Sequence, residues 1–220
     1  MDERRSNRIA GWSGIVFSIL SLAVLPVVIS PAPPAVGVPG AEVAAWFDAH
    51  RTGFLIGNYL GILAFVPGFV QLAILVASIR KAEPEGGWLA YLVFGSGTFA
   101  YAVFACSLCV FQALPFLVAP HLHLSIEAIG SLAAVWFSLD GLGALPMILA
   151  VAWAGRSTRV LPGWFTYFSA VVGVLAFVMS LGAFASQPTS IAAGGGTTGL
   201  GFVAFFVWTF VLGVLFLRRR

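Results

Sequence analysis

Six apolar segments run through this chain of 220 residues, and nearly all of its positive charge falls in every second connection between them. The segments cover roughly residues 9–29, 53–79, 88–118, 126–154, 164–185 and 199–217. An α-helix needs about 20 apolar residues to cross the ~30 Å hydrocarbon core of a bilayer, and each segment is about that long or longer. The pattern therefore predicts six membrane-spanning helices.

The basic residues indicate the orientation of these helices. Of the 11 Lys and Arg residues, only Arg51 falls outside the connections on one side of the apolar series. Basic residues in short connections are retained on the cytoplasmic side, so we expect both termini in the cytoplasm. Arg51 follows Asp48 and His50, and Asp48 is its candidate local partner. The residues expected in the cytoplasm are Arg4, Arg5, Arg8, Arg80, Lys81, Arg156, Arg159, Arg218, Arg219 and Arg220.

The composition favours a membrane protein without a soluble domain. With 60% hydrophobic and 9% charged residues, the chain has too little polar surface to cover a soluble globule. We predict an all-α polytopic membrane bundle, with residues 1–220 as one domain. The cytoplasmic flanks account for the net charge of +3, so we expect the lipid bilayer and not a nucleic acid as the partner. Segment 9–29 is longer than the roughly 7 to 15 apolar residues of a signal peptide, which favours a retained anchor.

The first outer connection has its own pattern. Four prolines in residues 31–39 favour an extended lead, and residues 41–51 have helix-forming composition. We expect a short helix at the outer interface, which either anchors the second spanning helix or forms a lid over an outward cavity. Pro67, Pro115 and Pro146 are expected kink points in the longer segments.

A Gly-Trp pair recurs at equal intervals, with its tryptophan at Trp12, Trp88 and Trp164. Each pair is expected to open a helix that runs from the inside to the outside. Two explanations stay open. The chain contains three repeated helical hairpins, or the tryptophans are interfacial anchors, which are common at the membrane surface.

Two stripes of small residues recur every four positions and predict close helix packing, because small side chains let backbones approach. A contact within the chain is favoured over one between subunits. The stripes are Gly53, Gly57 and Gly61 in the second segment and Ala10, Gly14 and Ser18 in the first.

Asp140 is the first candidate for chemistry, because it lies near the middle of the fourth apolar segment. A charged side chain there costs about 2.5 to 3.5 kcal/mol on insertion scales, and no Lys or Arg lies at that depth. Burial without a counter-charge favours the neutral carboxyl. Its expected neighbours are Thr98, Tyr101 and Thr209. A structural hydrogen bond and a role in proton transfer or ligand recognition are both open.

A second polar group is expected toward the outer side. Its members either line an outward vestibule or are separately solvated at the interface. They are Asn58, Gln112, His121, His123 and Glu127, with Asp48 and His50 as additional members. The histidines and carboxylates are metal-ligand types, but their spacing matches no specific site, so we expect no metal and no other cofactor.

Two further motifs carry little chemistry. Cys106 and Cys109 have the spacing of a redox pair, but they lie inside an apolar segment and are expected to pack in the core. Gly194, Gly196 and Gly199 fit the dinucleotide fingerprint literally. That fingerprint needs a preceding strand, which the sequence does not predict here.

The chain resembles a family of small six-helix bacterial membrane proteins, of the kind abundant in actinobacteria, for which no activity is established. The resemblance rests on residues 8–12, on residues 41–51 leading into 57–60, and on residues 161–164. It implies the bundle architecture and a location in the bacterial plasma membrane. It implies no catalytic residue.

Two function classes are consistent with the sequence. The favoured one is a binding, transport or accessory bundle, which holds a lipid-like small molecule or a membrane protein partner. The alternative is a membrane-embedded enzyme that acts on a lipid or isoprenoid substrate, with Asp140 as acid or base. Most acid-base enzymes need a positioned partner for their first catalytic group, and only Asp140 is plainly in the apolar core, so we lean away from an enzyme.

Overall fold

The protein is an all-helical bundle. The computed structural model describes residues 2–29, 38–84, 87–116, 123–181 and 196–219; within these ranges, the side chains of residues 25–29, 114, 123–127, 130, 133–134, 137–138, 179 and 196–199 are not described. The elements are α1 (Glu3–Ile29), α2 (Gly40–Ala82), α3 (Leu89–Ala113), the 3₁₀ turn η1 (Leu114–Phe116), α4 (His123–Ser157), α5 (Gly163–Ser180) and α6 (Gly196–Arg218).

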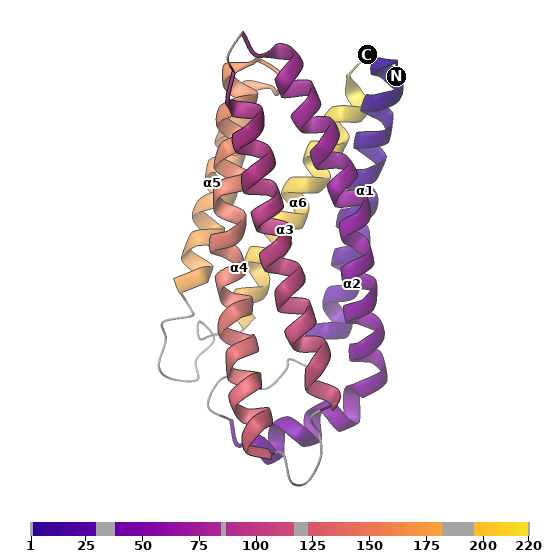
Figure 1. Ribbon diagram of the computed structural model, residues 1–220, viewed down its shortest axis with the longest axis vertical. Helices are drawn as coiled ribbons and strands as arrows, with labels where there is room; N and C mark the ends of the chain where they lie inside the picture. The colour runs from indigo at the N-terminus through magenta and orange to yellow at the C-terminus, as the bar shows by residue number, and fades with distance from the viewer. Residues whose placement is uncertain (1, 30–37, 85–86, 117–122, 182–195, 220) are drawn as a thin grey trace.

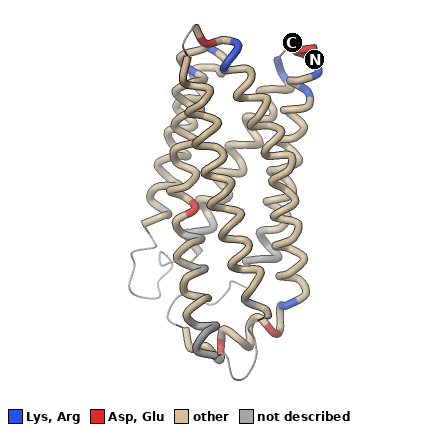
Figure 2. Tube along the Cα trace, viewed as in Figure 1, with Lys and Arg blue, Asp and Glu red and all other residues tan. Residues whose placement is uncertain are grey.

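Both ends of the chain lie at the same end of the bundle, together with the α2–α3 and α4–α5 connections (Figure 1). We call this the terminal end and the other the opposite end. All described Lys and Arg residues except Arg51 gather at the terminal end (Figure 2). The predicted separation of basic residues along the bundle axis is therefore present in the fold.

Apolar length supports a membrane position for much of the bundle. Among the described residues, four helical stretches are long and apolar enough to cross a membrane: Glu3–Val24, Gly40–Ala82, Leu89–Ala113 and Leu200–Arg218. A shorter apolar helix covers Gly163–Val178. The protein is thus a membrane-type helical bundle.

The start of α2 differs from the sequence prediction. A separate outer helix over residues 41–51 was expected, and this is wrong: these residues are the first turns of α2, which continues to Ala82. Gly53 does not end the helix, because one glycine in a helix interior costs only about 1 kcal/mol relative to alanine. The first turns of α2 lie across the opposite end before the helix turns along the bundle (Figure 1).

The three prolines also behave differently from one another. Pro67 and Pro146 lie inside helices that continue past them, whereas Pro115 lies in the 3₁₀ turn that follows α3. The proline-rich lead over residues 31–37 and Gly194 lie outside the described residues. Gly196 and Gly199 belong to the first turns of α6, so these two glycines of the fingerprint are helical.

The six helices form a closed ring. Each helix packs on its neighbours in the sequence, and α6 packs on α1. Aromatic side chains fill the interior around Phe17, whose ring centroid lies 5.7 Å from that of Tyr101 and 5.6 Å from that of Phe206. Phe104 stacks on Phe205 at 5.4 Å in the same cluster. The middle of the bundle is therefore a packed aromatic core.

The first small-residue stripe is confirmed as an interface within the chain. Ala10, Gly14 and Ser18 are buried. Gly14 lies against the side chain of Gln71 on α2, and the Ser18 hydroxyl lies 2.8 Å from that of Thr209 on α6. One face of α1 thus contacts both of its neighbours in the ring.

The second stripe is only partly an interface. Gly57 is buried, and a methyl group at Gly61 would lie 3.3 Å from the Leu108 side chain of α3. Gly53 is exposed, so its predicted packing within the chain is wrong. The bend at the start of α2 removes Gly53 from the face that packs on the bundle.

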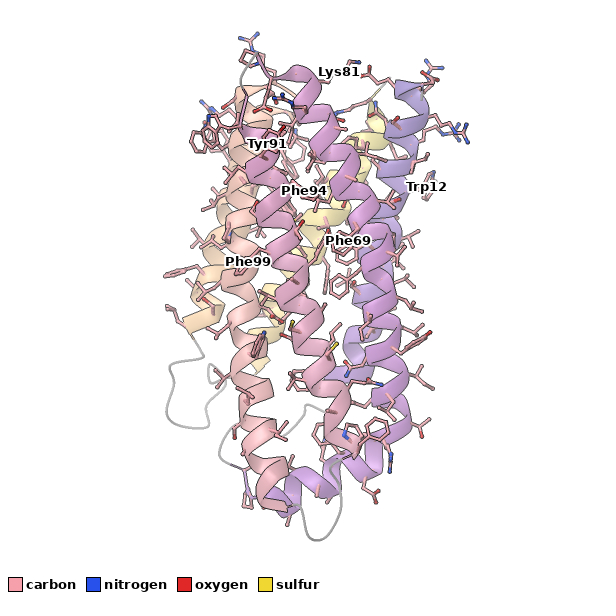
Figure 3. The ribbon with its side chains drawn as sticks, in the orientation of Figure 1. Trp12, Phe69, Lys81, Tyr91, Phe94 and Phe99 are labelled. Atoms are coloured by element: carbon pink, nitrogen blue, oxygen red, sulfur yellow. The ribbon has the colours of Figure 1, made fainter. Side chains whose placement is uncertain are left out.

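The three tryptophans of the Gly-Trp pairs share one environment. Trp12, Trp88 and Trp164 have exposed fractions of 57%, 52% and 53%. Trp12 projects from the bundle near the terminal end (Figure 3). Tryptophans that face outward at one level are typical of a membrane interface. The arrangement favours the anchor explanation, and the repeated-hairpin ancestry stays a prediction.

A carboxylate that the sequence analysis passed over organises the α2–α3 connection. Glu83 Oε1 accepts a hydrogen bond from the backbone N–H of Leu89 at 2.6 Å, and Oε2 accepts one from Ala90 at 3.3 Å. These N–H groups belong to the first turn of α3, where no intrahelical partner is available. Glu83 therefore caps α3 from the end of the preceding helix.

The contact between α1 and α6 can be tested at Gly213. A methyl group there would lie 2.8 Å from the backbone oxygen of Gly11 and 3.2 Å from the backbone nitrogen of Ile15, and backbone atoms cannot move aside. We expect Gly213→Ala to lower the free energy of unfolding by about 1 to 3 kcal/mol, measured by denaturing-detergent titration. Gly95→Ala is the control, because that site is open. An equal effect of both changes would contradict the close approach.

Candidate functional site

Asp140 is completely buried, and only one of its two carboxyl oxygens has a hydrogen-bond partner. Its carboxyl lies on α4 with an exposed fraction of 0%. The Ser107 hydroxyl of α3 donates a hydrogen bond to Oδ1 at 2.7 Å. Oδ2 has no hydrogen-bond partner. Ser107 thus joins α3 to α4 through Asp140, the acidic residue that the sequence analysis selected in the fourth apolar segment.

The expected partners of Asp140 were wrong. The Tyr101 hydroxyl donates to the backbone oxygen of Gly68 at 3.3 Å, and Thr209 is bonded to Ser18. The Thr98 hydroxyl is buried without a partner. Similar depth in the membrane was not enough to identify the partner of Asp140, because the side of α3 also matters. Tyr101 and Ser107 are six positions apart on this helix. At 3.6 residues per turn they lie on different faces, Tyr101 toward α2 and Ser107 toward α4.

Helix α5 comes close to α4 beside Asp140. A methyl group at the adjacent Gly141 would overlap the backbone oxygen of Ala176. Asp140 is therefore enclosed between α3 and α5. The sequence could have identified Ser107 as a hydroxyl on α3 that comes opposite Asp140. That alignment of α3 with α4 is known only once the two helices are packed.

A second buried polar contact was missed altogether. Gln71 on α2 is buried, and its Nε2 donates to the backbone oxygen of Thr209 on α6 at 3.2 Å. With the Ser18–Thr209 bond, this contact joins three helices. The indole N–H of Trp208 likewise donates to the Ser169 hydroxyl at 2.8 Å, which joins α6 to α5. These groups have partners and act as structural links.

Asn58 differs from them, because it is completely buried and has no partner. Its exposed fraction is 0%, and neither its amide nitrogen nor its amide oxygen has a hydrogen-bond partner. An amide buried without hydrogen bonds costs several kcal/mol in hydrocarbon. Of the outer residues predicted from sequence, Asn58 is the one whose environment most strongly requires a partner.

The packing of α2 on α3 places Gln112 in the same half of the bundle as Asn58. The ring centroids of Phe54 and Phe111 lie 6.1 Å apart, and one to two turns further along α2 Gly61 lies against Leu108. Asn58 falls between these two contacts, opposite the part of α3 between Leu108 and Phe111, and Gln112 follows Phe111 toward the opposite end. The side-chain oxygen of Gln112 is also buried without a partner.

The first turns of α2 cover this region. Val43, Ala44 and Phe47 pack with Val24, Phe54 and Phe111 in a small apolar cluster at the opposite end. The indole nitrogen of Trp46, next to this cluster, is a further buried donor without a partner. Residues 41–51 thus continue directly into α2 and pack on this cluster. Both alternatives, an anchor for α2 and a lid over an outward cavity, stay predictions.

The other expected members of the outer group lie elsewhere or are not described. Asp48 is exposed, and the His50 Nδ1 donates to the backbone oxygen of Trp46 at 2.7 Å. The Arg51 guanidinium lies over the ring of Phe116, 5.5 Å from its centroid, and not in a described ion pair with Asp48. His121 lies outside the described residues. His123 and Glu127 are in the first turns of α4, and their side chains lie outside the description.

Metal and thiol chemistry find no support in the described part of the chain. Within it, no three His, Cys, Asp or Glu side chains are grouped as metal ligands. Cys106 and Cys109 are unpaired and exposed on the outside of the bundle. The expectation that they pack in the core is wrong, because α3 turns their face away from its neighbours.

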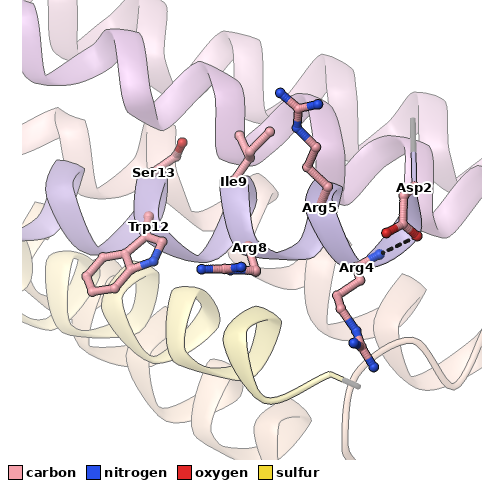
Figure 4. Close-up of a pocket in the computed structure, with 7 residues that line it drawn as sticks. All are labelled: Asp2, Arg4, Arg5, Arg8, Ile9, Trp12 and Ser13. Carbon is pink, nitrogen blue, oxygen red and sulfur yellow. Dashed lines mark hydrogen bonds between the residues drawn. The ribbon is translucent and has the colours of Figure 1, made fainter.

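Two cavities lie at the terminal end. One, of about 650 Å³, is lined by Asp2, Arg4, Arg5, Arg8, Ile9, Trp12 and Ser13 of the first helix and its start (Figure 4). The other, of about 520 Å³, lies between α1, α2, Val160 and Arg219. Asp140 lines neither of them.

No family model, no curated protein and no solved structure matches the chain. The resemblance to six-helix bacterial membrane proteins is therefore not supported by these comparisons. The case for any function rests on the geometry of the chain itself.

The link between Ser107 and Asp140 can be measured with a double-mutant cycle. We expect Ser107→Ala to cost about 0.6 to 1.7 kcal/mol of unfolding free energy in the wild-type background, the range for hydrogen bonds between membrane helices. In an Asp140→Leu background the same change should cost clearly less, because only the bond of Ser107 within α3, to the backbone oxygen of Val103 at 3.2 Å, is left to lose. Ser96→Ala is the control, since that hydroxyl bonds only within its own helix. Equal costs in both backgrounds would disprove the coupling.

Proposed function

We propose that the protein is a six-span integral protein of the bacterial plasma membrane, with the terminal end in the cytoplasm. Nearly all described basic residues lie at that end, together with the exposed Trp12, Trp88 and Trp164. Basic connections are retained in the cytoplasm, which supports this orientation. Tryptophans prefer the membrane interface, so their position indicates how deep the bundle lies in the bilayer.

Labelling of single cysteines tests this topology. In a Cys106→Ser, Cys109→Ser background, Asp48→Cys and Ser157→Cys place one exposed thiol at the opposite and terminal ends. We expect a membrane-impermeant maleimide to label the Asp48→Cys variant in right-side-out vesicles, and the Ser157→Cys variant only after the vesicles are opened. The reverse pattern would overturn the orientation, and labelling of both in sealed vesicles would overturn the spanning arrangement.

Within this membrane bundle, the proposed biochemical role is binding of an amphiphilic small molecule with a neutral polar group. The observation that carries the proposal is Asn58, completely buried with both amide atoms unpartnered. Hydrocarbon offers no water to satisfy such a group. Because Asn58 has no accessible surface in the packed bundle, a polar group that both donates and accepts hydrogen bonds would satisfy it after the surrounding helices move apart to admit the ligand.

The surrounding atoms define the ligand class. Asn58 offers two N–H donors and one carbonyl oxygen, and Gln112 offers a second buried carbonyl oxygen in the same half of the bundle. No described Lys, Arg, Asp or Glu is bonded to either amide. Phe54 and Phe111 supply apolar surface beside them. These groups suit a hydroxyl or amide attached to an apolar tail, and they offer no charge for an anion or a cation.

An enzymatic role for Asp140 is the weaker proposal. Its only described hydrogen-bond partner is the Ser107 hydroxyl, which is neither an acid nor a base at neutral pH. General acid-base chemistry requires a positioned second group. The contacts of Asp140 instead support a structural link between α3 and α4.

The binding proposal predicts opposite outcomes for two buried amides. We expect wild-type protein purified in mild detergent to retain an amphiphile, detected by native mass spectrometry. Asn58→Leu should lose it, because the polar contacts are gone. Gln71→Leu is the matched control: Gln71 is equally buried but already bonded to Thr209, so the ligand should stay.

Two results would contradict the proposal. One is wild-type protein that carries no amphiphile even when it is extracted with native lipids. The other is equal retention in wild type and Asn58→Leu. Thermal unfolding in the same detergent shows that both variants are folded, and removal of an unpaired amide should leave the apparent stability of Asn58→Leu without ligand unchanged or raised.

A further inference from the structure

The terminal end of α1 carries a concave basic surface. Arg4, Arg5 and Arg8 are exposed and line the cavity of about 650 Å³ together with Trp12. Figure 4 shows the side chains of Arg5, Arg8 and Trp12 projecting from successive turns of this helix. Residues three and four positions apart are neighbours on a helix surface, so this set forms one site.

The positive charge of this surface is not neutralised within the described chain. The described ion pairs are Arg80–Glu83 and Lys81–Glu3, and neither includes the three arginines of α1. Asp2 lines the cavity, and its Oδ1 accepts a hydrogen bond from the backbone N–H of Arg4 at 3.3 Å. Three guanidinium groups against one carboxylate leave an excess of positive charge. Guanidinium groups bind phosphate oxygens in bidentate fashion.

An apolar strip continues from the arginines along the outer face of α1. Ile9, Trp12, Val16 and Ile19 follow one another at helical spacing and are all exposed. The strip runs from the basic surface toward the middle of the bundle. A tryptophan between a polar and an apolar zone is typical of the membrane interface. The surface thus offers a charged end and an apolar length, in the order in which a phospholipid presents its headgroup and acyl chain.

The second terminal cavity is less suited to an anion. It is lined by Lys81 and Arg219, but Lys81 Nζ is already 2.5 Å from a carboxylate oxygen of Glu3, which also lines that cavity. A bound phosphate would have to compete with Glu3. The arginines of α1 are in no described ion pair, and the carboxylate of Asp2 beside them accepts a hydrogen bond from the backbone N–H of Arg4.

We propose that the face of α1 formed by Arg4, Arg5, Arg8 and Trp12 binds one anionic phospholipid. The arginines contact the phosphate, and an acyl chain lies along Trp12, Val16 and Ile19. The inference rests on the proposed membrane position of α1 and not on the amphiphile site at Asn58. It adds a second ligand of opposite character, anionic and at the cytoplasmic surface.

Lipid binding to the reconstituted full chain tests the proposal. Native mass spectrometry would count phosphatidylglycerol bound to wild type, to Arg5→Gln/Arg8→Gln and to Arg156→Gln/Arg159→Gln. The last variant removes two exposed positive charges from the same end and controls for the general field. We expect roughly 10- to 30-fold weaker binding for the first variant, since each basic group near a membrane contributes about fivefold. The control should change binding by less than about threefold on the same scale.

Binding measurements with other ligands, and with a Trp12 variant, identify the ligand class. Phosphatidylcholine should bind at least about tenfold more weakly than phosphatidylglycerol if net negative charge is recognised. Inorganic phosphate at millimolar concentration should not displace the lipid, because it cannot use the apolar strip. Trp12→Ala should weaken lipid binding and leave inorganic phosphate binding unchanged.

Several outcomes would overturn the proposal. Equal weakening in the two double variants would assign binding to the general charge of the terminal end, and displacement by inorganic phosphate would make the surface a simple anion site. Asn58→Leu should bind phosphatidylglycerol as the wild type does, so the failure of one site is distinguishable from failure of the other. All the substituted arginines are exposed, and thermal unfolding checks that each variant is folded.

Discussion

The close approach of the first and last helices is the contact on which the bundle depends. Gly11 and Gly213 bring the backbones of α1 and α6 together, and any side chain at either position would meet the other helix. This contact closes the ring, and it places Thr209 where Ser18 and Gln71 can reach it. Hydrophobic attraction contributes little between helices that are already in lipid, so close packing and hydrogen bonds must hold them. The aromatic core around Phe17 fills the space that the closed ring encloses.

Buried polar groups in this bundle fall into two classes with different meanings. Ser107 with Asp140, Gln71 with Thr209, and Trp208 with Ser169 are pairs that join neighbouring helices. Asn58 and Gln112 retain buried atoms without partners. In a medium without water, an unpaired group is costly. The Thr98 hydroxyl and one oxygen of Asp140 also lack a partner, but in Asn58 both polar side-chain atoms do. This contrast, and not the presence of polar residues as such, is the basis for proposing a ligand there.

The two ends of the bundle are built for different environments. The terminal end combines exposed arginines with exposed tryptophans, and Glu83 caps α3 there without removing the excess of positive charge. At the opposite end, the first turns of α2 lie over an apolar cluster and carry the exposed Asp48. The asymmetry suits a bilayer, where one surface attracts anionic headgroups and the other faces the exterior.

The sequence by itself determined the helical class, the approximate positions of the apolar helices apart from the start of α2, and the separation of basic residues along the bundle. These follow from apolar length and charge, which act locally and need no knowledge of packing. Only the tertiary structure decided which polar groups meet. Asp140 was recognised from its position in an apolar segment, but its partner Ser107 depends on the rotation and register of α3 against α4. Gln71 and Glu83 were overlooked for the same reason, since a polar residue becomes a link only when a neighbouring helix presents a backbone group to it. The sequence identified Asn58 as a candidate. Its burial without a partner is a property of the packed bundle, because it depends on how α2 packs on the neighbouring helices.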